Sequence, residues 1–158
     1  MTSTKGILAA VAVGVLFGTI ASGALAASLK SQLVGTWALV SETSSTGIQP
    51  FGPNPVGIAI YDRSGHFSTQ RMRADLPKFA ANSKNGGTDA ENKAVVQGIM
   101  SLFGTYTVDE AAHTRLLHII GASYPNIDGT DLKESVVIKG NLMTITNPIT
   151  TIVWQRAK

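Results

Sequence analysis

The feature that most constrains this chain is the segment Gly35-Thr36-Trp37, which lies in a stretch that alternates like a β-strand. Across residues 33–42 the odd and the even positions are both largely apolar. This is expected of a strand with structure on both of its faces. Arg156 lies near the far end of the sequence, and a guanidinium can pack over an indole face. If Trp37 and Arg156 pair, the first and last strands are neighbours and the sheet closes on itself.

The rest of the sequence consists mainly of short strand-like segments separated by turn residues. Strands are predicted at 33–42, 56–61, 66–72, 104–108, 114–122, 132–138, 142–146 and 150–156. Asp62-Arg63-Ser64-Gly65 and Lys139-Gly140-Asn141 are typical hairpin turns between neighbouring strands. The pattern predicts an all-β fold, an eight-stranded up-and-down antiparallel barrel. A barrel of this size has an interior that side chains or one small ligand can fill.

One segment carries helical signals instead. Thr88-Asp89-Ala90-Glu91 has the pattern of a capping box, and apolar residues follow it at helical spacing. We predict one amphipathic helix at about 89–103, inserted between the third and fourth strands. Its stripe of Val95, Ile99 and Leu102 is expected to face one end or flank of the barrel. The glycine-rich stretch before the helix makes it the predicted lid.

Residues 1–26 have the pattern of an export signal. Lys5 supplies a positive charge, residues 7–20 are apolar and uncharged, and Ala24-Leu25-Ala26 is a small-x-small cleavage motif. The apolar run is short for a bilayer span of about 20 residues, which favours cleavage over a retained anchor. The remaining 132 residues (158 − 26) suit a single barrel domain, 27–158. We expect a periplasmic or secreted protein with no stable membrane anchor after cleavage.

Composition and motifs exclude several classes of function. The formal net charge of the chain is +3, and no run of basic residues could follow a phosphate backbone, so no nucleic-acid partner is expected. The spacing of His66, His113 and His118 does not indicate a metal site. No cofactor is predicted either, because the sequence has no phosphate-binding loop and no dinucleotide motif.

The predicted barrel interior supplies the candidate ligand-binding residues. His118 lies mid-strand and would be the most interesting polar group inside, since an imidazole can orient a carbonyl or hydroxyl ligand. Tyr106 offers an apolar ring with a hydroxyl group. A core or outward-facing histidine is the alternative interpretation of His118. The predicted ligand-binding residues are Leu39, Ile58, Ile60, Gln70, Tyr106, Leu116, His118 and Ile120, and the predicted apolar wall also includes Val136, Ile138 and Ile145.

Arg71 and Arg73 share a face of the predicted strand 66–72 and the residue after it. The favoured interpretation places Arg71 outside the barrel or beside Asp75. The alternative turns it inward, where it could pair with an anionic ligand head group.

Several motifs together resemble the bacterial and fungal lipocalin-like domain family. They are Gly35-Thr36-Trp37-Ala38-Leu39-Val40-Ser41, Pro50-Phe51-Gly52-Pro53-Asn54-Pro55-Val56-Gly57, Tyr61 with Gly65, Gln70-Arg71-Met72-Arg73, Phe103-Gly104-Thr105-Tyr106-Thr107-Val108-Asp109-Glu110, and Pro125-Asn126 with Gly129-Thr130-Asp131. The resemblance covers essentially all of residues 27–158. It implies a barrel whose floor is closed by the tryptophan and the terminal arginine, with a cavity inside.

The chain departs from this family in its long strand after the predicted helix. The family often carries two adjacent histidines and a glutamate there, and the corresponding positions here are Leu117, His118 and Ile120.

The leading hypothesis is an exported barrel that binds a small, mostly hydrophobic molecule. One alternative is a cofactor-free isomerase or cyclase that uses His118 or Tyr106 as its acid–base group. Another is a structural barrel filled by its own side chains.

Overall fold

The computed structural model describes residues 1–2 and 27–158. The predicted export signal therefore lies almost entirely outside the described residues. Within the described ranges, no helix combines the length and the apolar character that crossing a membrane requires.

Eight strands form one closed barrel in which each strand pairs antiparallel with its neighbours in sequence and β8 pairs with β1. The strands are β1 (Gly35–Ser44), β2 (Val56–Tyr61), β3 (His66–Met72), β4 (Ile99–Asp109), β5 (Thr114–Ala122), β6 (Asp131–Lys139), β7 (Leu142–Asn147) and β8 (Thr150–Arg156). The predicted eight-stranded up-and-down antiparallel barrel is confirmed. The predicted bounds of β2, β3, β5 and β8 are those observed.

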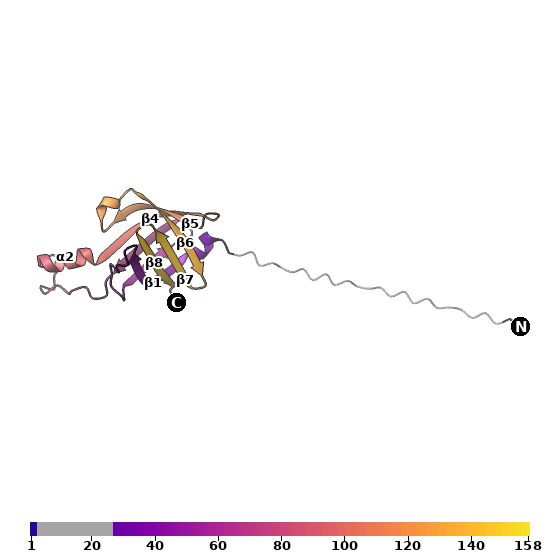
Figure 1. Ribbon diagram of the computed structural model, residues 1–158, viewed down its shortest axis with the longest axis horizontal. Coiled ribbons are helices and arrows are strands. Elements are labelled where there is room, and N and C mark those ends of the chain that lie inside the picture. Colours follow the sequence, from indigo (N-terminus) through magenta and orange to yellow (C-terminus); the bar gives the residue numbers. More distant parts are fainter. Residues whose placement is uncertain (3–26) are drawn as a thin grey trace.

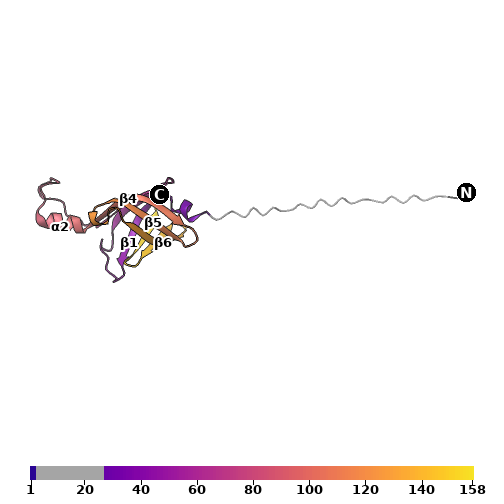
Figure 2. The ribbon, with the colours of Figure 1, turned by 90° about the horizontal axis from the view of Figure 1, so that it is seen from above.

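The helical elements lie at opposite ends of the barrel. Figures 1 and 2 show α1 (Leu29–Leu33) at one end of the barrel and α2 (Asp89–Gln97) projecting from the other end. A short 3-10 helix, η1 (Pro125–Ile127), follows β5. The predicted capping box of α2 is present, with Thr88 and Glu91 bonded reciprocally.

The predicted helix 89–103 was too long. The helix ends at Gln97, with Gly98 as its C-cap, and residues 99–103 are instead the first part of β4, which pairs in register with β3 from Met72↔Ile99 onward. Sheet pairing overrides the apolar spacing that mimicked a helix in this segment. No residue of α2 is buried, and both views show it standing away from the barrel, so it does not cover the barrel as a lid.

Trp37 and Arg156 close one end of the barrel, as the sequence predicted. They are register partners in the β1–β8 pair, and the Arg156 guanidinium carbon lies 4.1 Å from the indole centroid. The Arg156 guanidinium also donates to the backbone oxygens of Val34 (3.2 Å) and Gln32 (2.6 Å). The indole N–H of Trp37 donates to the Leu33 oxygen at 2.8 Å. These bonds fix the floor of the barrel against the segment that precedes β1.

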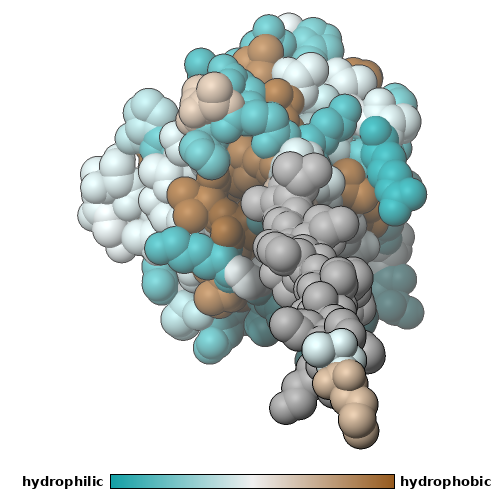
Figure 3. All heavy atoms as spheres, turned by 90° about the vertical axis from the view of Figure 1, so that its right-hand side faces the viewer, coloured by the Kyte–Doolittle hydropathy of each residue, from teal (hydrophilic) through white to brown (hydrophobic). Residues whose placement is uncertain are grey.

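Gly35 and α1 complete this floor. Gly35 has φ +129°, and a Cβ there would lie 2.9 Å from Arg156 Nη1, so glycine suits both the backbone and the packing. Leu29 and Leu33 of α1 are buried against the barrel core. The Glu110 carboxylate accepts the backbone N–H groups of Leu29 (2.6 Å) and Lys30 (2.9 Å). Seen from this end (Figure 3), apolar surface shows between hydrophilic side chains.

The inward face of β2 is the reverse of the one we predicted. Ile58 and Ile60 are 38% and 45% exposed, whereas Ala59 and Tyr61 are buried. Ala59 is the register partner of Trp37. Because the large indole already fills the interior at that level, a small residue fits on the neighbouring strand.

The inward face of β5 is also reversed. Leu116 and Ile120 are 40% and 54% exposed, and Arg115, Leu117 and Ile119 face the interior. Each of the two alternating faces of this strand carries two large aliphatic residues. Hydropathy alone would therefore turn the face that carries the charged Arg115 outward. Glu134 on the neighbouring strand β6 is an acidic partner for Arg115 inside the barrel, and this ion pair turns the face that carries Arg115 inward.

Candidate functional site

A cavity of about 450 Å³ lies inside the barrel at the end opposite Trp37. Its position follows from its lining, which includes Ser44 at the end of β1 and Asn147 and Thr150 at the β7–β8 turn. Its volume falls in the range of small-molecule sites, about 300–1,000 Å³. The barrel interior is therefore apolar and packed around Trp37 and hollow at the other end.

The walls of the cavity are largely apolar. Side chains from several strands and from the β5–β6 connection supply this surface: Met100, Leu102, Ile119, Ile127, Leu132, Ile149, Ile152 and Trp154. Ile119, Ile152 and Trp154 are also buried members of the hydrophobic core, so the cavity sits directly on the packed part of the barrel. Apolar walls of this kind suit an apolar ligand.

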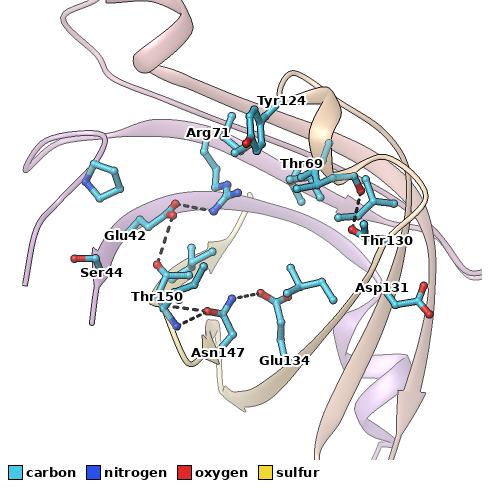
Figure 4. A pocket seen from close by; sticks show the side chains of 18 of the residues that line it. Glu42, Ser44, Thr69, Arg71, Tyr124, Thr130, Asp131, Glu134, Asn147 and Thr150 are labelled. Atoms are coloured by element: carbon cyan, nitrogen blue, oxygen red, sulfur yellow. Dashed lines mark hydrogen bonds and ion pairs between the residues drawn. The ribbon is translucent and has the colours of Figure 1, made fainter. Parts of the chain in front are cut away.

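A chain of polar side chains crosses the cavity (Figure 4). Arg71 Nη1 donates to Glu42 Oε2 at 2.8 Å, and Thr150 Oγ1 donates to Glu42 Oε1 at 3.5 Å. The backbone N–H of Thr150 donates to Asn147 Oδ1 at 3.0 Å, and Asn147 Nδ2 donates to Glu134 Oε1 at 2.9 Å. These residues come from β3, β1, β8, β7 and β6, so the network ties distant parts of the barrel wall together.

The chain of contacts continues into the core. Arg115 Nε donates to Glu134 Oε2 at 2.9 Å, and Arg115 Nη1 bonds the hydroxyl of Tyr61. The Arg115 and Glu134 side chains are only 4% and 2% exposed. Tyr61 in turn meets Tyr106 edge-on, with the ring centroids 5.3 Å apart. We call the residues from Arg71 to Tyr61 the buried polar network: Arg71, Glu42, Thr150, Asn147, Glu134, Arg115 and Tyr61.

The electrostatics of this network reflect burial and pairing together. Burial raises the pKa of Glu42 above its ordinary value, although Arg71 opposes the shift. Burial also raises the pKa of Tyr61, against the attraction of Arg115. For Arg115, burial works against the charged form, but Tyr61 and Glu134 outweigh it and the pKa of the guanidinium is raised. Arg115 therefore stays charged, and its pair with Glu134 is a fixed feature of the cavity.

Two buried polar side-chain atoms have no hydrogen-bond partner among the described residues, Arg71 Nε and Trp154 Nε1. Both residues line the cavity, and both atoms are N–H donors. Buried polar groups are nearly always bonded, so each exception calls for a physical reason. The cavity thus carries spare donors beside a network whose acceptors are already in use.

Arg71 and Tyr124 both line the cavity and lie side by side (Figure 4). Tyr124 is half exposed and stands beside Arg71 in Figure 4, while the Arg71 guanidinium carbon lies 5.9 Å from the ring centroid of Phe51. A second hollow, of about 360 Å³, shares Glu42, Arg71 and Tyr124 with the cavity and extends to α2. The second hollow therefore adjoins the cavity on the side of α2.

None of the predicted ligand-binding residues lines this cavity. Leu39 and Tyr106 do face the interior, and the Tyr106 hydroxyl donates to the Asp62 backbone oxygen at 2.7 Å. Val136, Ile138 and Ile145 are likewise buried or packed against the core, as predicted. Gln70 is exposed on the outer face of β3.

His118 is outside the barrel. Its side chain is 54% exposed, and its Nδ1 lies 2.8 Å from Asp131 Oδ1. The inward orientation that the sequence analysis considered is therefore wrong, for the same change of phase that moves Leu116 and Ile120 outward. The isomerase or cyclase hypothesis relied on His118 or Tyr106, and neither side chain reaches the cavity.

Arg71 took the less favoured of its two predicted orientations. It points inward with an 11% exposed side chain and pairs with Glu42, whereas Arg73 pairs with Asp75 outside. Glu42, Arg115 and Glu134 were not predicted as site residues. Only Arg115 carried a local signal, as a charged residue beside the apolar pair Leu116 and Leu117, because Glu42 and Glu134 have polar neighbours in the sequence. In the described residues, no group of three or more His, Asp or Glu side chains is placed to hold a metal ion.

A closed eight-stranded antiparallel barrel with a cavity at one end belongs to the class of lipocalin-like barrels. The model of one family, the lipocalin-like domain, matches residues 34–157. The chain is thus a member of the lipocalin-like domain family.

Relatives and solved structures resemble the chain to different extents. The 4'-hydroxy-3'-methoxypropiophenone carrier protein of Aspergillus oryzae is 31% identical over 84 residues, which cover 49% of this chain and 76% of that protein. A crystallised lipocalin-like protein from Bacteroides uniformis has 12% identity and a TM-score of 0.47, with 79% of this chain and 98% of that chain covered. A protein from Bacteroides eggerthii has 13% identity and a TM-score of 0.45, covering 78% and 98%.

Proposed function

We propose that this chain is an exported binding protein that holds one small, mostly hydrophobic molecule in the barrel cavity. The observation that carries the proposal is the cavity of about 450 Å³, which has apolar walls and a few buried polar groups. This combination is typical of small-molecule sites in proteins. A barrel filled by its own side chains would not leave such a space above a core that is otherwise closely packed.

The fungal relative supports the choice of a first ligand to test. Its name describes a carrier of 4'-hydroxy-3'-methoxypropiophenone, an aromatic ketone. A molecule of that kind combines an apolar ring with polar oxygens, and the cavity combines apolar walls with spare donors. We therefore use this ketone as the probe.

The test compares two tryptophan substitutions on adjacent residues of β5. Ile119 lines the cavity and Ile120 faces outward, so Ile119→Trp fills the cavity and Ile120→Trp is the matched control. Binding is measured by calorimetric titration with the ketone and by native mass spectrometry of the purified protein. We expect the parent and Ile120→Trp to bind, and Ile119→Trp to bind at least about tenfold more weakly.

Thermal unfolding of both variants accompanies the titration, because overpacking a core costs about 1–3 kcal/mol. A folded Ile119→Trp variant that binds as tightly as the parent would place the ligand elsewhere. A parent that binds no ketone and carries no co-purified molecule would remove the proposal.

Export is a separate part of the proposal and has its own experiment. The signal-like pattern of residues 1–26 supports it. We expect the full chain, expressed in a bacterium with two membranes, to reach the periplasm and to begin at Ala27. N-terminal sequencing and cell fractionation measure both. An intact N-terminus on protein that stays in the cytoplasm would refute export while leaving the binding proposal in place.

A further inference from the structure

The buried polar network has no net charge. It contains two arginines and two glutamates, paired as Arg71 with Glu42 and Arg115 with Glu134. Asp131, at the cavity rim, is exposed and pairs with His118 on the outside. The interior of the cavity therefore has no unpaired positive charge to offer a ligand.

The charged residues of the cavity leave donors rather than acceptors unused. Both Glu42 oxygens and both Glu134 oxygens accept hydrogen bonds within the network. Arg71 uses only Nη1 within the network, and its Nε has no partner among the described residues. Trp154 Nε1 is a second donor in the same situation. The hydroxyls of Thr69 and Tyr124 also line the cavity and can donate or accept, so a ligand acceptor finds donors there.

We propose that the cavity selects uncharged ligands that carry a hydrogen-bond acceptor, such as ketones, and rejects carboxylates of similar size, because Glu42 and Glu134 already neutralise both arginines. This inference rests on the proposed function, since it names the ligand class of the same cavity. A bound carboxylate would place an uncompensated negative charge beside Glu42 and Glu134, and burying an unpaired charge is strongly unfavourable. A neutral carbonyl oxygen adds no charge and accepts from Arg71.

The test uses three probes that share a phenyl ring. Propiophenone is a neutral ketone, propylbenzene has no acceptor, and hydrocinnamate is a carboxylate that is ionised at neutral pH. Each competes against a polarity-sensitive dye bound to the parent protein. We expect propiophenone to bind at least about tenfold more tightly than hydrocinnamate in the parent.

Removing the charge of Glu42 tests whether the charge balance of the cavity causes the preference for the ketone over the carboxylate. Glu42→Gln removes one negative charge from the cavity and leaves Arg71 uncompensated, so we expect hydrocinnamate to gain about tenfold or more in affinity. Asp75→Asn is the matched control, because it removes the same charge from the exposed Arg73–Asp75 pair. We expect this control to change none of the three affinities.

The double variant Glu42→Gln/Arg71→Met tests both halves of the inference. It restores a neutral cavity and removes the Arg71 donors. The gain for hydrocinnamate should therefore disappear, and the affinity for propiophenone should fall about fivefold relative to propylbenzene. A propiophenone-to-propylbenzene ratio equal to that of the parent would refute the role of the acceptor.

Two further results would overturn the charge argument. One is a parent protein that binds hydrocinnamate as tightly as propiophenone. The other is an equal gain for hydrocinnamate in Glu42→Gln and Asp75→Asn. Glu42→Gln is used only if it shows a melting transition. Without one, the test relies on the ratio of propiophenone to hydrocinnamate affinity in the parent and on the affinities of the double variant. Binding of no probe at all would refute the proposed function itself.

Discussion

Truncation of Trp37 is the sharpest test of how the barrel is closed. The indole is fully buried, its N–H donates to the Leu33 oxygen at 2.8 Å, and Arg156 lies 4.1 Å from its centroid. Large-to-small changes at such core positions cost about 3–5 kcal/mol. We expect Trp37→Ala to lower the free energy of unfolding by that amount. Trp37→Phe keeps a ring but loses the donor and weakens the cation–π contact, so about 1–2 kcal/mol is expected.

The assay is urea unfolding followed by circular dichroism, with Phe103→Ala as the control for losing an exposed aromatic ring. Phe103 is 52% exposed, and surface changes usually stay within about 0.5 kcal/mol. A double-mutant cycle with Arg156→Met measures the pair directly, and we expect a coupling of about 0.5–2 kcal/mol. The reasoning is refuted if Trp37→Ala unfolds within about 1 kcal/mol of the parent, or if the coupling is zero.

Three other predictions concern the buried polar network and the outer surface. Arg115→Met should destabilise the protein by about 3–5 kcal/mol in urea unfolding by stranding Glu134, and Arg115→Met/Glu134→Leu should recover much of the loss; equal instability of both variants would contradict this. Burial raises the pKa of Glu42, so the folded chain binds this proton more tightly than the unfolded chain does. Between the ordinary value of 4.5 and the higher folded value, the contribution of Glu42 to the free energy of unfolding should fall as pH rises. Glu42→Gln should remove this slope from a pH series of unfolding curves, and an unchanged slope would assign it to another group. His118→Phe should leave the calorimetric affinity for the ketone within about twofold of the parent, because the side chain lies outside the barrel; a loss of about tenfold would place it in the site.

Strand positions and the closure of the barrel could be predicted because they depend on short-range patterns. Turn residues delimit the strands, and the Gly35-Thr36-Trp37 segment with Arg156 identifies the floor. The helix was overextended because Ile99 and Leu102 fit a helical spacing as well as a strand. Pairing with β3 settles that ambiguity, and no local pattern contains this information.

The candidate site could not be predicted because it depends on which face of each strand points inward. In β5, Leu116 and Ile120 compete with Leu117 and Ile119 on equal hydrophobic terms, so hydropathy does not decide between the two phases. The decisive group is Arg115, a residue type that is usually exposed, and it is buried because it pairs with Glu134, its register partner on the neighbouring strand β6. A shift of one residue in β5 moved Leu116, His118 and Ile120 to the outside, and the same kind of shift in β2 moved Ile58 and Ile60 there.

The pairing of β8 with both β1 and β7 also determines when the chain can become a barrel. The contacts between β1 and β8, which lie at opposite ends of the barrel sequence, form late and slowly. Until residues 150–156 are in place, β1 and β7 each present an open edge that can pair with another chain. Before β8 pairs, the open edges of β1 and β7 are therefore the sites at which aggregation can begin. Pairing of β8 with both strands covers these edges.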